Sequence, residues 1–260
     1  MAGSVRQIIE VPCTVEALER SEALSQLAPE ALTALGAESI DGDALGVEAA
    51  ARVDAAIEAC LAAYDPRGVY KLFNPAICTL PPEYSEPAIK LVGTMMMFHG
   101  QSVYERLRRA AHCALMAVTI GPDNPAALPA DADELDRALA DACARALVES
   151  AADHVNAAIV AAAYGRTGLY TDDRLSPGMG DFPLDTRSQF VFYTQSEKRL
   201  GLKLGKDGVF EPRYSTVGVI GLYDPSHKGR KRACGRCKYR SYCSIRAIGM
   251  TCHGGKGSFK

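Results

Sequence analysis

No stretch of this sequence approaches the run of about 20 apolar residues that a membrane-spanning helix requires. The opening segment MAGSVRQIIEVPC also lacks the charged and then apolar regions that characterise a secretory signal. We therefore expect a cytoplasmic protein without membrane contact. Because thiols stay reduced in that compartment, the nine cysteines are expected to bind metal or to pack in a core, and disulfides are not expected.

Acidic residues are missing from one region, residues 226–260, which holds ten Lys or Arg and no Asp or Glu. Subtracting these ten from the 29 basic residues leaves 19, against 31 acidic residues, in the rest of the chain. The body therefore carries a formal charge of −12 and the tail +10. Such a tail could contact nucleic acid, an acidic protein or the protein's own body, or it could be solvated charge beside a metal site.

Length and composition are those of a globular chain, with 260 residues of which 48% are hydrophobic and 23% charged. A chain of this size can form one large domain with an appended segment. We expect an Ala-rich helical segment over residues 1–65, an α/β domain over residues 66–225 and a basic, cysteine-containing tail over residues 226–260.

Strand-like and helix-like segments alternate through the middle of the chain. The runs GVYKLF, MMMFHG, CALMAVTIG and YSTVGVIGLYD are apolar or rich in β-branched and aromatic residues, which predicts strands. Helices are predicted for SVYERLRRAAH, for residues 133–164 and for TRSQFVFYTQSEKRLG. This alternation indicates a mixed α/β domain and leaves the order of the strands open.

The segment DDRLSPGMGD has the residues of a ligand-binding loop. Gly178 and Gly180 allow the backbone to approach a ligand closely, Pro177 stiffens the turn, and Arg174 can pair with a carboxylate through two hydrogen bonds. The segment therefore suits an amino-acid-like ligand. An ordinary Gly-Pro turn that binds nothing is the alternative.

The longer segment RLSPGMGDFPLD resembles the Arg-x-Ser/Ala-Pro-Gly-Tyr loop in the activation domain of cobalamin-dependent methionine synthases and their stand-alone relatives. Three other segments resemble the same family in the same order: HCALMAVTIG its strand ending in Thr-x-Gly, ALVESAADHVN one of its helices, and FEPRYSTVGVIGLYD its late strand. Together these segments cover roughly residues 68–225.

The resemblance implies a C-shaped α/β (α+β) domain with a twisted antiparallel sheet and helices. In the family, this domain binds S-adenosylmethionine and gives its methyl group to a corrinoid whose cobalt has been oxidised to Co(II). Carried over, Arg174 would hold the methionine carboxylate, while Ser176, Pro177 and Gly178 would contact the ligand through the backbone. Glu149 would be the acidic group near the sulfonium, and is the candidate catalytic residue.

One position departs from the family pattern. Met179 stands where the family usually has Tyr, so an aromatic ring or hydroxyl near the adenosyl group is missing. This difference bears on the affinity for S-adenosylmethionine and on the identity of the ligand.

Four cysteines lie within 19 residues of the tail, as Cys234, Cys237, Cys243 and Cys252. A Cys-x2-Cys pair places two thiolates close enough to share a metal, and the later cysteines can complete a tetrahedral set, with His253 as a possible substitute for Cys252. Zinc and an iron–sulfur cluster both fit four thiolates. The other cysteines, Cys13, Cys60, Cys78, Cys113 and Cys143, are expected to pack in the core.

These features predict a methyltransferase-type component that reactivates the oxidised corrinoid of a partner methyltransferase such as methionine synthase. The chain has no flavin or nicotinamide motif, so a cluster in the tail would relay an electron from a low-potential donor. The corrinoid would belong to the partner, because the signature Asp-x-His-x-x-Gly of corrinoid-binding modules is absent.

Two other functions remain open at this point. The basic tail could be a zinc-binding nucleic-acid module, with Tyr239 and Tyr242 available to stack on bases. Alternatively, the protein could be a non-catalytic partner of a corrinoid protein. Met179, in place of the family's Tyr, is compatible with this function.

Overall fold

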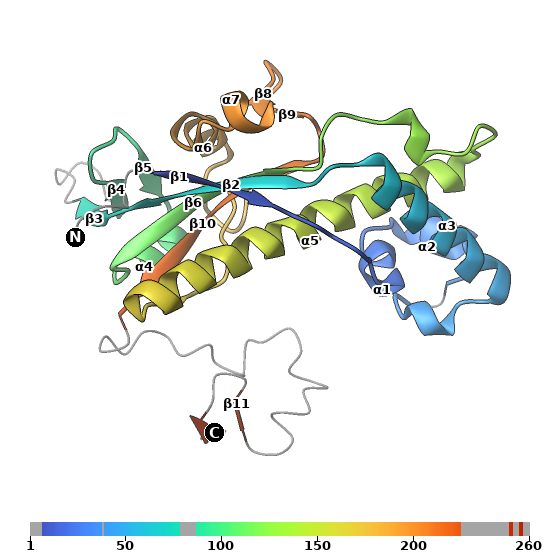
Figure 1. Ribbon diagram of the computed structural model, residues 1–260, viewed down its shortest axis with the longest axis horizontal. Helices are drawn as coiled ribbons and strands as arrows, with labels where there is room; N and C mark the ends of the chain where they lie inside the picture. Colours follow the sequence, from blue (N-terminus) through green and yellow to red (C-terminus); the bar gives the residue numbers. More distant parts are fainter. Residues whose placement is uncertain (1–6, 38, 79–86, 225–249, 252–254, 257–260) are drawn as a thin grey trace.

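A curled, five-stranded antiparallel sheet forms the centre of the protein, with helices on both faces (Figure 1). The computed structural model describes residues 7–37, 39–78, 87–224, 250–251 and 255–256. In spatial order the sheet contains β1 (Ile8–Pro12), β2 (Arg67–Phe73), β6 (His112–Thr119), β10 (Ser215–Tyr223) and β7 (Tyr170–Thr171). All neighbours in this sheet are antiparallel.

The longest helix and a pair of shorter helices cover the two faces of the central sheet. The described helices are α1 (Arg20–Leu24), α2 (Pro29–Ala34), α3 (Val47–Ala63), α4 (Gln101–Leu107), α5 (Glu134–Thr167), α6 (Arg187–Thr194) and α7 (Ser196–Leu200), with 3-10 turns at Gly42–Ala44, Pro125–Ala127 and Leu184–Thr186. Helix α5 runs along one face of the sheet, and α6 and α7 cover the other (Figure 1).

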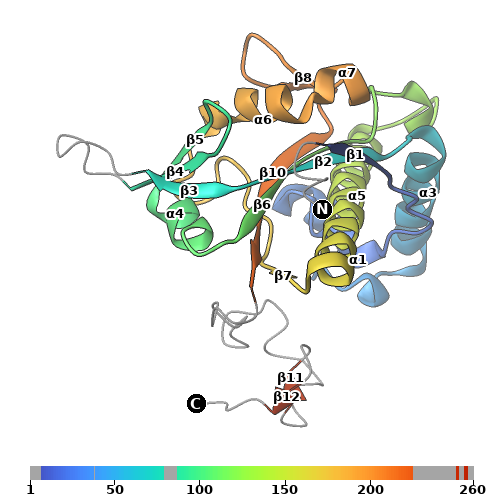
Figure 2. The ribbon, with the colours of Figure 1, turned by 60° about the vertical axis from the view of Figure 1, so that its left-hand side comes forward.

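Smaller sheets complete the fold. Strands β3 (Pro75–Cys78), β4 (Ala88–Leu91) and β5 (Met97–His99) form an antiparallel sheet beside α4 (Figure 2). Strand β8 (Lys203–Leu204) pairs with β9 (Phe210–Glu211), and β11 (Met250–Thr251) pairs with β12 (Gly255–Lys256).

Helix α5 is 34 residues long and connects two regions of the core. Apolar residues recur at every fourth position, so they form a row that turns gradually around the helix. The first of them pack with α1 and α3, and the later ones pack against the sheet: Leu139, Cys143, Leu147, Ala151, Val155 and Ile159. The helix lies close to the sheet at Gly68, where a Cβ atom would be 2.3 Å from Cγ2 of Val155.

The opposite face of the sheet has a cluster of three phenylalanines. The ring of Phe98 on β5 lies 5.4 Å from that of Phe182 and 5.8 Å from that of Phe190 on α6, measured between centroids. All three side chains are buried. Because Phe182 belongs to the connection between β7 and α6, this cluster fixes the end of that connection against the sheet.

The mixed fold of an antiparallel sheet with helices is confirmed. One sequence expectation is wrong in part, because residues 1–65 are not helical throughout: Ile8–Pro12 form β1, which pairs with β2 at the edge of the sheet. The short run IIEV has β-branched residues that suit an extended edge strand. The predicted strand MMMFHG is also shorter than expected, since only Met97–His99 pair and Met95 is 86% exposed.

Four of the isolated cysteines, Cys13, Cys60, Cys113 and Cys143, are buried free thiols, and Cys78 is partly exposed. Burial raises the pKa of Cys60 and Cys143 to about 12, so both stay neutral at physiological pH. The interpretation as core residues is confirmed for the four buried cysteines, whereas Cys78 is not part of the core.

The tail cysteines Cys234, Cys237, Cys243 and Cys252 lie outside the described residues, as does His253. Within the described part of the chain, no group of three or more His, Cys, Asp or Glu side chains is placed to hold a metal ion. No described helix is both long enough and apolar enough to cross a bilayer.

Candidate ligand-binding site

Residues 174–182, which we call the Arg174 loop, form a tight turn between β7 and α6. Gly178 has φ 97° and Gly180 has φ 61°, which are backbone conformations that residues with a Cβ atom rarely adopt. The N–H of Gly178 donates to the carbonyl of Phe182 at 2.7 Å, and the N–H of Met179 donates to the carbonyl of Ser176 at 3.0 Å. The two glycines therefore allow the loop to close on itself.

The far end of the Arg174 loop is attached to the start of α4. The carboxylate of Asp181 accepts hydrogen bonds from the backbone N–H groups of Gln101 and Ser102, at 2.5 and 3.0 Å. This approach requires Gly100, because a Cβ atom there would lie 2.7 Å from the carbonyl oxygen of Asp181. Hydrogen bonds from the side chain and backbone of Ser102, and then from the backbone of Gln101, hold the pKa of the Asp181 carboxyl below its ordinary value.

Asp181→Asn is expected to lower the thermal midpoint at pH 7. Because the pKa of Asp181 is lowered in the folded state, its ionised form contributes stability above the ordinary Asp value of about 4, and that contribution is lost as the pH falls below it. The difference between variant and parent should therefore shrink at acidic pH in melting curves followed by circular dichroism. Asp185→Asn, on the same connection and exposed, is the control. A difference that does not change with pH would contradict this account.

Arg174 extends across β10 and reaches α5. Its side chain is only 14% exposed, and Nη2 donates to Oε2 of Glu149. The aliphatic part of the side chain passes over Gly218, where a Cβ atom would lie 2.6 Å from Cγ and 2.8 Å from Cδ of Arg174. Gly218 thus leaves the space through which the guanidinium reaches its position.

The guanidinium of Arg174 is incompletely satisfied. Its Nη1 atom is buried and has no hydrogen-bond partner among the described residues. Glu149, its ion-pair partner on α5, keeps 52% of its side chain exposed. An unpaired buried donor costs about 1–3 kcal/mol, so an incoming acceptor at Nη1 would be favoured.

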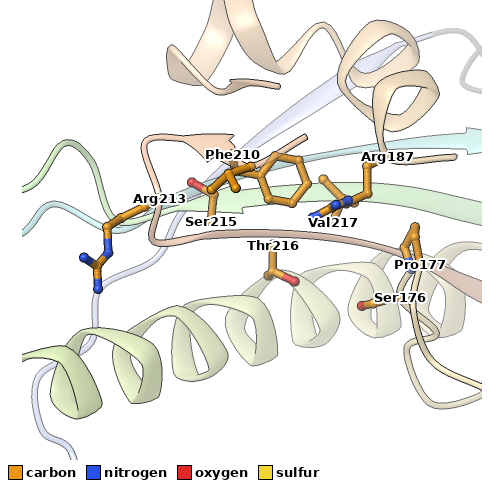
Figure 3. Close-up of a pocket in the computed structure, with 9 residues that line it drawn as sticks. Ser176, Pro177, Arg187, Phe210, Arg213, Ser215, Thr216 and Val217 are labelled. Atoms are coloured by element: carbon orange, nitrogen blue, oxygen red, sulfur yellow. The ribbon is translucent and has the colours of Figure 1, made fainter. Parts of the chain in front are cut away.

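A pocket of about 260 Å³ lies beside the Arg174 loop (Figure 3). We call it the edge pocket. Its lining comes from the Arg174 loop, the start of α6, strand β9 with the residue before it, and the start of β10 with the residues before it. The lining residues are Ser176, Pro177, Arg187, Val209, Phe210, Arg213, Ser215, Thr216 and Val217. The hydroxyl-bearing side chains of Ser176 and Thr216 lie on the side of β10 nearer α5, while Phe210, Val217 and Arg187 lie on the other side (Figure 3).

The two arginines of the edge pocket differ in their partners. Arg213 forms an ion pair with Asp141, and its guanidinium carbon lies 4.4 Å from the ring centroid of Tyr214. In Figure 3 the Arg213 side chain points away from the other labelled residues. Arg187 instead donates through Nε to the carbonyl of Leu184 at 3.2 Å, and its guanidinium carbon lies 5.3 Å from the ring centroid of Phe210.

The structure brings the candidate residues of the body together. Arg174 and Glu149 form the ion pair, Ser176 and Pro177 line the edge pocket, and Gly178 forms the turn that follows. Their roles in binding stay predictions. Sequence reasoning did not identify Arg187, Phe210 or Thr216 as site residues. Arg187 lies in a predicted helix, and Phe210 and Thr216 lie in the segment that resembles the family's late strand, which assigns no role to either side chain.

Comparison with known proteins gives a match of fold. No protein-family model matches the chain, and no curated protein matches it. Among solved structures, a crystal structure of the MetH reactivation domain bound to AdoHcy is similar, with a TM-score of 0.58. The alignment covers 85% of this chain and 79% of that chain, at 19% sequence identity. At this identity the likeness concerns the fold, a curled antiparallel sheet with helices.

Proposed function

We propose that the protein binds S-adenosylmethionine at the Arg174 loop and uses it to remethylate, and so reactivate, an oxidised corrinoid on a partner protein. The similarity of fold to a reactivation domain crystallised with AdoHcy supports this proposal. AdoHcy is what remains of S-adenosylmethionine after its methyl group has been transferred. The protein would then act as a methyltransferase component together with a corrinoid-binding methyltransferase.

The observation that carries the proposal is the unpartnered Nη1 of Arg174. A carboxylate at this atom would supply the missing acceptor, and carboxylates are good partners for guanidinium groups. Gly178, with φ 97°, forms the turn of the same loop. The half-exposed carboxylate of Glu149 would offer a negative charge to the sulfonium. The described residues therefore fit a ligand that carries both a carboxylate and a positive charge.

Met179 fits this proposal without the aromatic residue that is usual in the family. Its Sδ accepts a hydrogen bond from the N–H of Ser176 at 3.3 Å, and its side chain is 48% exposed. The thioether therefore helps to close the loop and presents a flexible apolar surface next to the edge pocket. Binding of the adenosyl group would then depend on apolar contact, without a hydroxyl or an aromatic ring from this position.

In the proposed reaction one electron reduces Co(II) of the substrate corrinoid to Co(I), which attacks the methyl carbon. The carbon–sulfur bond breaks with its electron pair left on sulfur, and S-adenosylhomocysteine is released. This step needs no proton transfer. The chain's own residues would hold the ligand so that its methyl group faces the partner, with Arg174 fixing the carboxylate end and Glu149 the charge near sulfur.

The four tail cysteines would hold a metal centre in the same protein. As an iron–sulfur cluster it would supply one-electron transfer from a low-potential donor, whereas zinc would be structural. The same proposal places the protein in the cytoplasm. Iron and acid-labile sulfide in protein purified without oxygen would support the relay, and one zinc without iron would exclude it.

Calorimetric titration with S-adenosylmethionine and S-adenosylhomocysteine tests the binding step directly. We expect one molecule of either compound per chain, because the carboxylate that Arg174 would bind is present in both. Absence of binding at millimolar ligand would overturn the enzymatic proposal and favour a non-catalytic partner of a corrinoid protein.

A further inference from the structure

The edge pocket contains backbone groups of β10 that no strand pairs. Leu175 and Val219 exchange two backbone hydrogen bonds of 2.9 Å, so the N–H and C=O of Val219 point away from β6. In an antiparallel strand these directions alternate with a period of two residues, so the N–H and C=O of Val217 point to the same edge. Strand β7 pairs only with Leu222 and Tyr223. Within the described part of the chain, no strand therefore pairs with this edge at Val217, a residue that is itself buried.

Three side chains of the edge pocket also have donors available. Among the described residues, no hydrogen bond involves the hydroxyls of Ser176 and Thr216. The Arg187 guanidinium has no acidic partner there, and only its Nε is engaged. By contrast, the hydroxyl of Ser215 lies 2.8 Å from Oγ1 of Thr119 and 2.7 Å from the carbonyl of Pro212, so it is already used.

The charge of the edge pocket selects the kind of ligand. Its nine lining residues include two arginines and no Asp or Glu. The ring of Phe210 and the carbonyl of Leu184 hold the Arg187 guanidinium in one orientation, so little side-chain freedom would be lost on binding. The pocket has a volume of about 260 Å³. That is enough for an oxyanion and part of the molecule that carries it.

We infer that the edge pocket binds an oxyanion, a carboxylate or a phosphate ester, with Arg187 as its charged partner and the hydroxyls of Ser176 and Thr216 as further donors. Two sources have this chemistry. One is the carboxylate of S-adenosylmethionine, which Arg187 would bind together with Arg174 or in its place. The other is a phosphodiester such as that of a corrinoid's nucleotide loop. The choice between these two sources rests on the proposed function. The oxyanion site itself is inferred independently of that function.

The site is tested with inorganic phosphate as the probe, by following backbone amide signals in nuclear magnetic resonance. We expect saturable shifts at Ser176, Thr216 and Val217 in the parent protein. Arg187→Ala should weaken this binding by about tenfold to a hundredfold, the usual effect of a hydrogen-bonded charge. Arg187→Gln, which keeps a polar side chain at this position, should show a similar loss and guards against a folding defect in the Ala variant.

Arg108→Ala is the matched control, because it removes the same charge from a partly exposed ion pair with Glu105 on α4. It should leave the phosphate affinity unchanged. No saturable shift in the parent, or equal affinity in the parent and both Arg187 variants, would overturn the inference. Neither result would bear on whether S-adenosylmethionine binds at Arg174, so the failure of this site is distinguishable from failure of the proposed function.

The source of the oxyanion follows from a second titration, with S-adenosylhomocysteine and its decarboxylated analogue. If Arg187→Ala weakens binding of the first compound about tenfold and leaves the second unchanged, the pocket binds the amino-acid carboxylate. If both affinities are unchanged while phosphate binding is lost, the oxyanion belongs to another ligand, and the phosphodiester is supported.

Discussion

Replacing Arg174 with Ala is expected to weaken the binding of S-adenosylmethionine by about tenfold to a hundredfold, the range for a lost hydrogen bond to a charged group. In the parent protein the side chain is 14% exposed and one of its nitrogens has no partner among the residues that the structure describes, so a ligand carboxylate would supply the missing acceptor. The variant also removes the ion pair of Glu149, a half-exposed carboxylate that water can solvate. We therefore expect a loss of affinity with little change in stability.

Two controls separate a specific contact from a general charge effect. Arg174→Lys keeps the charge but has no planar fork, and it should recover only part of the affinity. Arg108→Ala removes an arginine whose ion pair is with Glu105 on α4, and this variant should bind the ligand as the parent does. Calorimetric titration of all three variants gives the comparison. Parent-like affinity in Arg174→Ala would remove this residue from the binding site.

Gly218→Ala is expected to lower the affinity to a similar extent, although it leaves every charged group in place. The new methyl group would lie 2.6 Å from Cγ and 2.8 Å from Cδ of Arg174, so the side chain must leave its path across β10. Ala itself is compatible with a strand, and the arginine can turn toward solvent, so folding should be retained. The guanidinium would then no longer be held beside Glu149.

A double variant tests this cause. If Gly218→Ala acts by displacing Arg174, adding Arg174→Ala should produce little further loss, because residues that act through one contact are not additive. Gly46→Ala is the control for a glycine substitution, since no described residue other than its chain neighbours has an atom within 4 Å of its Cβ position. Full additivity of the two losses would mean that Gly218 affects binding by another route.

The sequence predicts the elements with strong local patterns. Helix α5 has an apolar residue at every fourth position, and β6 and β10 are continuous apolar runs, so their types follow from periodicity and composition. Strand β1 is missed because five residues next to Ala-rich segments give a weak local signal. Its pairing with β2 is a contact between segments nearly 60 residues apart, which local patterns do not contain.

In the candidate site, too, residues within a local motif can be predicted from the sequence, and residues that depend on tertiary contacts cannot. The sequence marks Arg174, Pro177 and Gly178 because a short loop contains them all, and the resemblance to a family adds Glu149. The function of Gly218 depends on the path of Arg174 above it, and that of Arg187 depends on its orientation by Phe210. These relations arise from tertiary packing, so neither residue can be singled out from the sequence. The metal-binding role of the tail cysteines remains a prediction from their spacing.

Transfer of a labelled methyl group tests the central proposal most directly. The protein is incubated without oxygen with a Co(II)-corrinoid protein, a low-potential reductant and S-adenosylmethionine labelled with ¹³C in its methyl group. We expect labelled methylcobalt and S-adenosylhomocysteine in equal amounts, at a rate that depends on this protein and falls in Arg174→Ala. An unlabelled corrinoid, or the same yield without the protein, would contradict its role as a reactivating methyltransferase component.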